Sequence, residues 1–425
     1  MLNPHLNLFS SRQYQNEVFG GEYMTVRPYN NISDGPIDFY VKDNKEYLDL
    51  RETVLSLKLH VVNSDGKPIP VTSDGKDNVA LVNNAMHSVF SDVHVSLNGK
   101  RVDGGDGYYG YRSLIGTVFR FSTEVQKQQL FAQGFMRDEC KAMDTVSNVG
   151  FQSRKAWTAN GASKSFFGGL NCSMFNQERY LLPNTKLHVR LERAKDAFAL
   201  FTNVSGLKPK IVIDDAKLHF MTVKVSPSIL EYHALELDRG VPATYELNRV
   251  QIATVPIKEL SLGVEKDEIF YGNAVPKYLF MAMVCNVAFY GDYGRNPFNF
   301  RHYNIKSLLI TRDDEKIPFE KFEPDFKNGD CLKEYMSLYQ SNALLGKNSV
   351  LPITYEEFQN GYTHFQWNLS DDRNGVNSNP NQRANIKLDI KFHEPLPEAI
   401  TVIFYGIFET TVQLYGDDHV LVNGV

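Results

Sequence analysis

The sequence predicts an all-β protein built as two tandem eight-stranded jelly-roll barrels, with short helices in the insertions between strands. Most of its strong periodic patterns are those of strands, in which apolar residues recur at every second position. The two halves of the chain repeat the same order of features, at an offset of roughly two hundred residues. With 425 residues in total, each half is long enough to bury a core of its own.

Alternating segments bounded by turn residues indicate strands throughout the chain. Residues 54–62 read VLSLKLHVV and residues 93–97 read VHVSL. The second segment ends at Asn98-Gly99, a pair that tolerates positive φ at both turn positions and so predicts a β-hairpin. Many short strands separated by Gly, Pro and Asn turns are typical of a sandwich or barrel. Further strands are expected at residues 187–191, 217–225, 278–290, 305–311, 386–392 and 400–414.

Helical patterns are few. Residues 109–121, 123–135 and 332–345 are predicted to be helical. A short helix near the middle of the chain is better marked, because Pro227 suits a first turn and Gly240 suits a stop. Its cap is either Ser226 or a capping box from Ser228 to Glu231.

The central helix is predicted to connect the two halves of the chain. The expected domains are an N-terminal arm at residues 1–21, a first jelly roll at 22–226, the connector helix at 227–240 and a second jelly roll at 241–425.

The composition argues against a protein whose main work is to grip phosphates, because the formal net charge is −5 and such proteins are usually basic. The four cysteines are not paired at metal-ligand or redox spacing, and we expect reduced thiols. The N-terminus has no signal-peptide pattern. The longest apolar stretch, residues 278–290, is too short to span a bilayer. We expect a protein that is made and assembled inside the cell.

No pattern predicts catalytic, cofactor-binding or metal-ligating residues. Residues 105–110 match G-x-G-x-x-G, but a polar hairpin arm precedes them instead of a buried parallel strand, which favours a plain turn. The histidines are scattered, without the close pair and carboxylate that a jelly-roll metal enzyme needs. Adjacent aspartates such as Asp313-Asp314 point to opposite faces of a strand or lie solvated in a loop. We expect no cofactor and no enzymatic activity.

Aromatic residues alternate with two arginines between residues 290 and 303, in the order YGDYGRNPFNFRHY. Such a segment could stack on nucleic acid. It could also pack at a subunit or inter-barrel interface, where Tyr, Phe and Arg are enriched. The net acidity of the chain favours the interface. The candidate interface residues are Tyr290, Tyr293, Arg295, Phe298, Phe300, Arg301 and Tyr303.

The N-terminal arm, residues 1–21, has no sustained strand or helix period and is rich in Asn, Ser and Gln. Its apolar residues are too few for an independent core, but Leu6, Leu8 and Phe9 are enough to dock on a partner. Chain termini are usually poorly ordered unless something ties them down. We expect an assembly arm, and a plain disordered tail is the alternative.

The segment NPFNFRHYNI at residues 296–305 resembles a motif of the hexon-like major capsid proteins of Polinton (Maverick) elements and adintoviruses. The resemblance continues, in the same order, from about residue 45 to the C-terminus. The other matching segments are VHVSLNGK at 93–100, LERAKDAF at 191–198, KVSPS at 224–228, EPDF at 323–326 with Gly329, NGYT at 360–363, and LDIKF at 388–392 with Leu396-Pro397.

The resemblance implies a structural protein of the virion. It implies a double jelly-roll subunit that forms pseudo-hexameric homotrimers, and these would tile an icosahedral shell around double-stranded DNA without a dedicated DNA-binding motif. The expected partners are neighbouring capsomers and the penton and minor capsid proteins. Two alternatives stay open: another jelly-roll virion component, such as a penton or minor capsid protein, and a jelly-roll carbohydrate-binding protein or enzyme.

Overall fold

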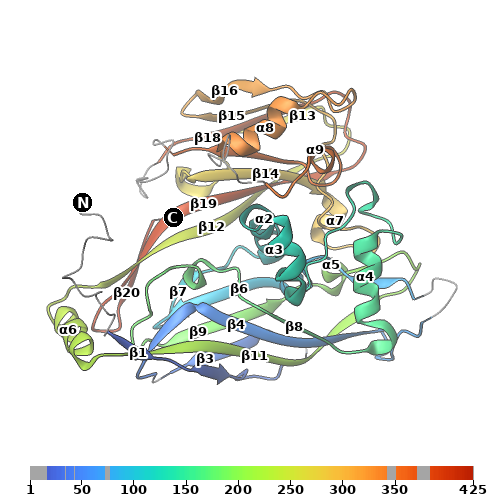
Figure 1. Ribbon diagram of the computed structural model, residues 1–425. Helices are drawn as coiled ribbons and strands as arrows, with labels where there is room; N and C mark the ends of the chain where they lie inside the picture. Colours follow the sequence, from blue (N-terminus) through green and yellow to red (C-terminus); the bar gives the residue numbers. More distant parts are fainter. Residues whose placement is uncertain are drawn as a thin grey trace, which may run out of the picture.

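Two β-barrels are stacked on each other in the computed structural model, which describes residues 17–33, 35–42, 44–71, 77–341, 351–370 and 383–424. The N-terminal half lies at the bottom of Figure 1 and the C-terminal half at the top, and long strands run from one to the other. The prediction of an all-β protein with two tandem jelly rolls and short helices is confirmed.

Two facing sheets form the first barrel. One sheet has the order β1-β11-β4-β8, with β2 also paired to β11, and the other has the order β3-β9-β6-β7. A separate ribbon pairs β5 with β10. The strands are β1 (Val18–Gly20), β2 (Tyr23–Val26), β3 (Ile37–Val41), β4 (Tyr47–Val62), β5 (Val79–Leu81), β6 (Phe90–Leu97), β7 (Lys100–Asp103), β8 (Lys164–Gly168), β9 (Leu187–Arg193), β10 (Leu200–Thr202) and β11 (Lys210–Val225).

The second barrel repeats this construction. Its sheets have the orders β12-β19-β14-β17 and β13-β18-β15-β16, and β20 extends the first sheet by pairing with β19. The strands are β12 (Ala243–Ile257), β13 (Gly263–Lys266), β14 (Tyr278–Cys285), β15 (Ile305–Arg312), β16 (Glu315–Phe322), β17 (His364–Asn368), β18 (Ile386–Phe392), β19 (Ile400–Leu414) and β20 (Val420–Asn423).

The two barrels share one topology. The main strands of the first barrel, in chain order, are β2, β3, β4, β6, β7, β8, β9 and β11. If each barrel's main strands are ranked from first to eighth, one sheet joins the first, eighth, third and sixth, and the other joins the second, seventh, fourth and fifth. This order is that of a jelly roll, and it occurs in both halves although their sequences match only in their order of features.

Several strands lie where the sequence predicts them. Asn98 (φ 46°) and Gly99 (φ 82°) form the expected tight turn between β6 and β7. The predicted strands at residues 386–392 and 400–414 coincide with β18 and β19. The predicted strand at residues 278–290 is wrong in its second part, because β14 ends at Cys285 and a short helix, α7, follows it.

Helices fill the connections between strands. The predicted helix at 109–121 is α2, whereas the one at 123–135 stops at Gln128 and continues as a tighter turn over Leu130–Gln133. The connector is α6, which begins after Ser226 and precedes Gly240 (φ 79°). Within the described ranges, no helix has the length and apolar character needed to cross a membrane. The helices are α1 (Ala85–Ser88), α2 (Tyr109–Arg120), α3 (Thr123–Gln128), α4 (Val149–Trp157), α5 (Asp196–Ala199), α6 (Pro227–Asp238), α7 (Asn286–Tyr290), α8 (Leu332–Ser341) and α9 (Tyr355–Gln359).

The β12–β19 pair links the two barrels. These strands pair without a break over fifteen residues, from Ala243 opposite Leu414 to Ile257 opposite Ile400. At one end of the ladder, Tyr245 and Leu247 belong to the first core. At the other end, side chains of both strands belong to the second core. One ladder therefore contributes to both cores.

The first half also contributes to the second core. Helix α2 lies in the insertion between β7 and β8, but it buries Tyr111, Leu114, Ile115 and Val118 in the same cluster as the strands of the second barrel. These positions are three or four residues apart and so share one face of the helix. Each half therefore supplies side chains that the other half needs for its core.

We expect the two halves to unfold together. Changing Leu114 to Ala removes a buried side chain from α2 and should lower the free energy of unfolding by about 2–5 kcal/mol. Calorimetry should record one transition, shifted as a whole, because the deleted contact joins both barrels. Exposed Phe167→Ala serves as the control and should change stability by less than about 0.5 kcal/mol. Two separate transitions, of which only one moves, would contradict the interlocked cores.

Candidate functional site

The aromatic segment at residues 290–303 lies in the connection between β14 and β15. Helix α7 ends at Tyr290, and Gly291 (φ 97°) then turns the chain. A Cβ at this glycine would lie 3.0 Å from the backbone nitrogen of Phe198, which belongs to the first half. The segment therefore passes directly against the first half, where a larger residue would not fit.

The two phenylalanines of the segment are enclosed within the chain. Phe298 and Phe300 are fully buried, and both pack against Tyr111 of α2, with ring centroids 5.7 and 6.3 Å away. Phe198 of α5 closes the cluster, at 5.4 Å from Tyr111 and 5.9 Å from Phe298. Edge-to-face pairs of this kind add to the free energy of burial. Tyr111 and Phe198 belong to the first half of the chain and Phe298 and Phe300 to the second, so this aromatic cluster connects the two halves.

Asn296 is the polar counterpart of this aromatic cluster. Its buried side-chain amide donates to Asp138 Oδ2 at 3.2 Å and to the Met143 carbonyl at 3.1 Å, and its backbone N–H donates to Asp144 Oδ1 at 2.8 Å. Asp138 in turn accepts from the buried Arg154 guanidinium at 2.7 Å. Because a buried carboxylate is costly unless its hydrogen bonds are satisfied, this network fixes the segment against the insertion of the first barrel.

Glu398 organises the outer side of the segment. Its Oε1 accepts from Arg301 Nη1 at 2.9 Å and from the Tyr303 hydroxyl at 3.2 Å. Its Oε2 lies 3.2 Å from Cys285 Sγ and 4.0 Å from Arg295 Nη2. Burial, followed by the charge of Glu398, raises the pKa of Tyr303 well above its usual range, so this hydroxyl stays protonated as a donor.

His302 and Tyr293 complete the segment. The His302 ring stacks on Phe326 with centroids 4.1 Å apart. Burial, with a smaller effect from the Arg301 charge, lowers the pKa of His302 to about 4, so the imidazole is neutral at pH 7. Tyr293 donates its hydroxyl to the Pro209 carbonyl at 3.0 Å, and its own carbonyl accepts from the Thr202 N–H at 2.7 Å.

The predicted interface residues therefore divide into two groups. Tyr290, Arg295 and Arg301 have exposed side chains, whereas Phe298, Phe300, Tyr293 and Tyr303 are turned to contacts within the chain. A role between subunits stays a prediction for the exposed group. Leu6, Leu8 and Phe9 lie outside the described residues.

Sequence reasoning missed three partners of this segment, and the role of Asn296 within it. The signal for Tyr111 was present, since it shares a helical stripe with Leu114 and Ile115. Phe198 lies in one of the segments that carry the family resemblance, but the spacing gives no hint that it meets Phe298. Asn296 and Glu398 have no local signal, because their roles depend on residues far along the chain.

The contacts of this region hold the 290–303 segment in place, and its charged side chains pair within the chain. A polar pocket of about 680 Å³ lies beside the segment, and the cations on its wall have carboxylate neighbours: Lys141 pairs with Glu356, and Arg301 with Glu398. In the part of the chain that the structure describes, no group of three His, Cys, Asp or Glu residues could hold a metal ion. Burial raises the pKa of Cys172, Cys285 and Cys331, which keeps these thiols protonated.

The G-x-G-x-x-G turn at residues 105–110 has its backbone donors already occupied. Asp92 Oδ2 accepts from the N–H groups of Gly105 and Gly107 at 2.9 and 3.0 Å. These are the donors that a phosphate would need, and a carboxylate of the chain itself takes them. The turn opens helix α2 at Tyr109, as the sequence predicts.

We expect acidic pH to lower the stability of the folded chain, because buried histidines resist protonation. His364 packs between Phe119 and Phe300, and burial lowers its pKa and that of His87 to about 4. The unfolded chain binds these protons below about pH 6.5 but the folded chain does not, so the free energy of unfolding should fall from about pH 6.5 to about pH 4.

Urea unfolding across this range measures the effect. Changing both His87 and His364 to Gln should reduce the pH dependence, with the remainder due to His302, whereas the exposed His393→Gln control should keep the slope of the unmodified protein. An unchanged slope in the double variant would show that other groups cause the acid sensitivity.

Comparisons with known proteins support the fold. No family model matches the chain. An uncharacterised protein of Caenorhabditis elegans is 21% identical over 405 residues, covering 90% of this chain and 92% of the relative.

Among solved structures, a chain of the Sputnik virophage matches with a TM-score of 0.62 and 12% identity, covering 100% of this chain and 92% of the other. The mavirus major capsid protein matches at 0.56 and 12%, covering 98% and 92%. The VP54 protein of the virus PBCV-1 matches at 0.56 and 13%, covering 98% and 99%. The chain thus has, along nearly its whole length, the double jelly-roll fold of viral major capsid proteins.

Proposed function

We propose that this protein is the major capsid protein of a virus or virus-like element with a double-stranded DNA genome. Three copies would form a homotrimer, and many trimers would tile an icosahedral shell together with penton and minor capsid proteins. The sequence segments from residue 93 to residue 397 support a place among the hexon-like proteins of Polinton elements and adintoviruses. The net charge of −5 suits a protein of the capsid shell more than a protein that binds DNA phosphates.

One observation carries this proposal: the same eight-strand order occurs twice in one chain, in barrels that are fixed to each other. Three such chains around a threefold axis would present six similar barrels, which approximates a hexagonal tile. Closed cyclic symmetry is the common solution for a homo-oligomer. A penton or minor capsid component would more often carry a single barrel, so the second barrel favours the major protein.

Exposed apolar side chains suggest where copies meet. Leu260 is 75% exposed and adopts a left-handed backbone (φ 63°), which costs a bulky residue about 1–2 kcal/mol. Val287 and Tyr290 of α7 are exposed as well. Leu260 and Asn286 both bond, through their backbone N–H groups, to the segment 396–399, which brings the two sites to the same end of the second barrel. We assign this patch, with Arg295 and Arg301 beside it, to contacts between copies.

The N-terminal arm remains part of the proposal. Leu6, Leu8 and Phe9 are its candidate contact residues for assembly, on the grounds of their apolar character in an otherwise polar segment.

We expect the purified protein to be a trimer. Light scattering at micromolar concentration should give three times the mass of the chain, with an interface above roughly 2,000 Å² per contact as in other obligate oligomers. Electron microscopy of the same sample should show triangular or hexagonal particles, and closed shells under assembly conditions. A stable monomer at micromolar concentration would overturn the trimer.

Leu260 provides a separate test of the contact patch. Asn adopts the left-handed conformation more easily, so Leu260→Asn should raise the folding stability of a single chain by about 1 kcal/mol while weakening the association of copies. Leu260→Met keeps the apolar area and should preserve association. Dilution followed by light scattering measures both variants. Equal association of Leu260→Asn and the unmodified protein would exclude Leu260 from the interface.

A further inference from the structure

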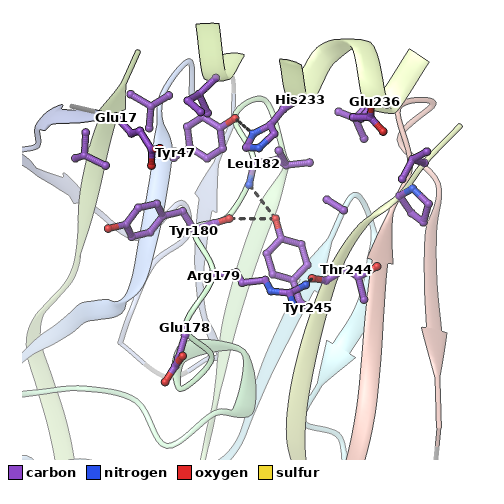
Figure 2. Close-up of a pocket in the computed structure, with 17 residues that line it drawn as sticks. Glu17, Tyr47, Glu178, Arg179, Tyr180, Leu182, His233, Glu236, Thr244 and Tyr245 are labelled. Carbon is purple, nitrogen blue, oxygen red and sulfur yellow. Dashed lines mark hydrogen bonds between the residues drawn. The ribbon is translucent and has the colours of Figure 1, made fainter. Parts of the chain in front are cut away.

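An open groove of about 510 Å³ lies below the connector helix α6, between this helix, the adjacent end of the first barrel and the start of β12. Figure 2 shows its lining, with Tyr47 and His233 on one side and Tyr180 and Tyr245 across from them. Ile229 and Leu237 of α6, with Val225 and Leu182, supply aliphatic surface.

The tyrosine and histidine side chains of this lining form hydrogen bonds within the groove wall. Tyr47 and His233 share a hydrogen bond of 2.6 Å, and the Tyr245 hydroxyl donates to the Tyr180 carbonyl at 3.2 Å while it accepts from the Leu182 N–H at 3.1 Å. Because these groups bond within the wall, the groove offers mainly the faces of the rings and the aliphatic side chains to an occupant.

Helix α6 is incompletely covered. None of its twelve residues is fully buried, although Ile229, Leu230, Leu235 and Leu237 are all apolar. A helix stabilised by packing normally buries an apolar stripe. Here the side of α6 that carries Ile229 and Leu237 borders the groove, so a segment lying in the groove would complete its packing.

The N-terminal end of the described chain leads directly into this groove. Glu17 and Val18 line its wall, and the Glu17 carbonyl accepts from the N–H of Ser226, the residue that precedes α6. Sixteen residues come before Glu17. An extended chain covers about 3.3 Å per residue and a helix only about 1.5 Å, so about six of these residues would span the twelve-residue helix α6.

The composition of residues 1–16 fits the lining. Their apolar residues include Leu6, Leu8 and Phe9, and Arg12 is their one Asp, Glu, Lys or Arg residue. The groove is lined by three carboxylates and one arginine, Arg179. Glu236 pairs with Arg239 at 2.8 Å and Arg179 lies 3.8 Å from Glu246, which leaves Glu17 and Glu178 as the acidic rim. A polar segment that carries the apolar cluster Leu6, Leu8 and Phe9, followed by one positive side chain, matches both the apolar lining and the acidic rim.

We infer that the groove under α6 is the docking site for the N-terminal segment of the same chain. Phe9 and its leucine neighbours would cover Ile229 and Leu237, and Arg12 would lie near the acidic rim. A segment that is already attached at the groove edge has a high effective concentration there, which favours the same chain over a second copy. The inference concerns the single chain before assembly, and the assembly contacts proposed above for Leu6, Leu8 and Phe9 would require the segment to leave the groove.

Photo-crosslinking tests this inference on the full-length protein. With p-benzoyl-phenylalanine in place of Phe9, irradiation should link residue 9 to the 229–245 region, and the product should keep the mobility of one chain on a denaturing gel. Mass spectrometry identifies the linked peptides. The test needs neither trimers nor shells, so a failure of the capsid proposal leaves it intact.

Matched variants make the outcome specific. Ile229→Asp should reduce the crosslink about tenfold, because it replaces an apolar side chain of the groove lining with a charged one. Leu230→Asp changes the next residue of α6, which is 38% exposed and does not line the groove, and it should leave the yield unchanged. Circular dichroism confirms that both variants fold.

Variants of the segment itself give a second measurement and leave the residues of both barrels unchanged. Arg12→Glu should lower the yield, and Arg12→Lys should restore it. Crosslinks that join two chains would assign the groove to a second copy, and crosslinks elsewhere on the surface would reject the site. Either result, or a yield that Ile229→Asp does not change, overturns the inference.

Discussion

The unbroken pairing of β12 with β19 fixes the relation between the two barrels. A slip of one residue in an antiparallel pair moves every side chain to the other face. In this pair such a slip would expose Tyr245 and Leu247 of the first core and, at the same time, the residues near Ile257 and Ile400 in the second. The register is therefore specified by two cores together. The barrels cannot rotate against each other without breaking a ladder that both need.

The contacts around Tyr111 and Asn296 reinforce this arrangement at a second place. They join the insertion that carries α2 to the connection between β14 and β15, and they combine a buried ring cluster with a satisfied buried ion pair. Apolar packing supplies most of the free energy in such a junction, whereas the amide and carboxylate bonds select one orientation. Two attachment points, one of backbone and one of side chains, make a rigid unit from two barrels.

The sequence was sufficient for the fold class and for most of the long strands. The strand β18 alternates regularly, whereas β19 begins with seven buried residues and then alternates, and both were predicted at their observed bounds. The strand β12 was missed for a physical reason. Its buried residues run Tyr245, Leu247 and then Val250, Ile252, so the alternation changes phase where the strand leaves the first core and enters the second. A search for strict alternation therefore does not recognise this strand. Pro256 weakens the strand signal further, although an edge strand such as β12 tolerates proline.

The candidate site was predictable only in part. The run of aromatics and arginines identified a contact segment, and the structure places some of these residues inside the chain and others at its surface. The spacing of residues in the sequence does not separate the buried side chains from the exposed ones. Phe298 is buried because it packs on Tyr111, and Arg301 stays at the surface because it pairs with Glu398. Long-range partners of this kind leave no trace in a local pattern.

The exchange of side chains between cores also limits how such proteins can be recombined. A chimera made at α6, with the first barrel of one protein and the second of another, would bring a foreign α2 face into the upper core and foreign β12 and β19 ends into the lower one. Both cores would be mismatched by a single crossover at an apparently convenient linker. The two barrels therefore cannot be exchanged independently, and each constrains the substitutions that the other can accept.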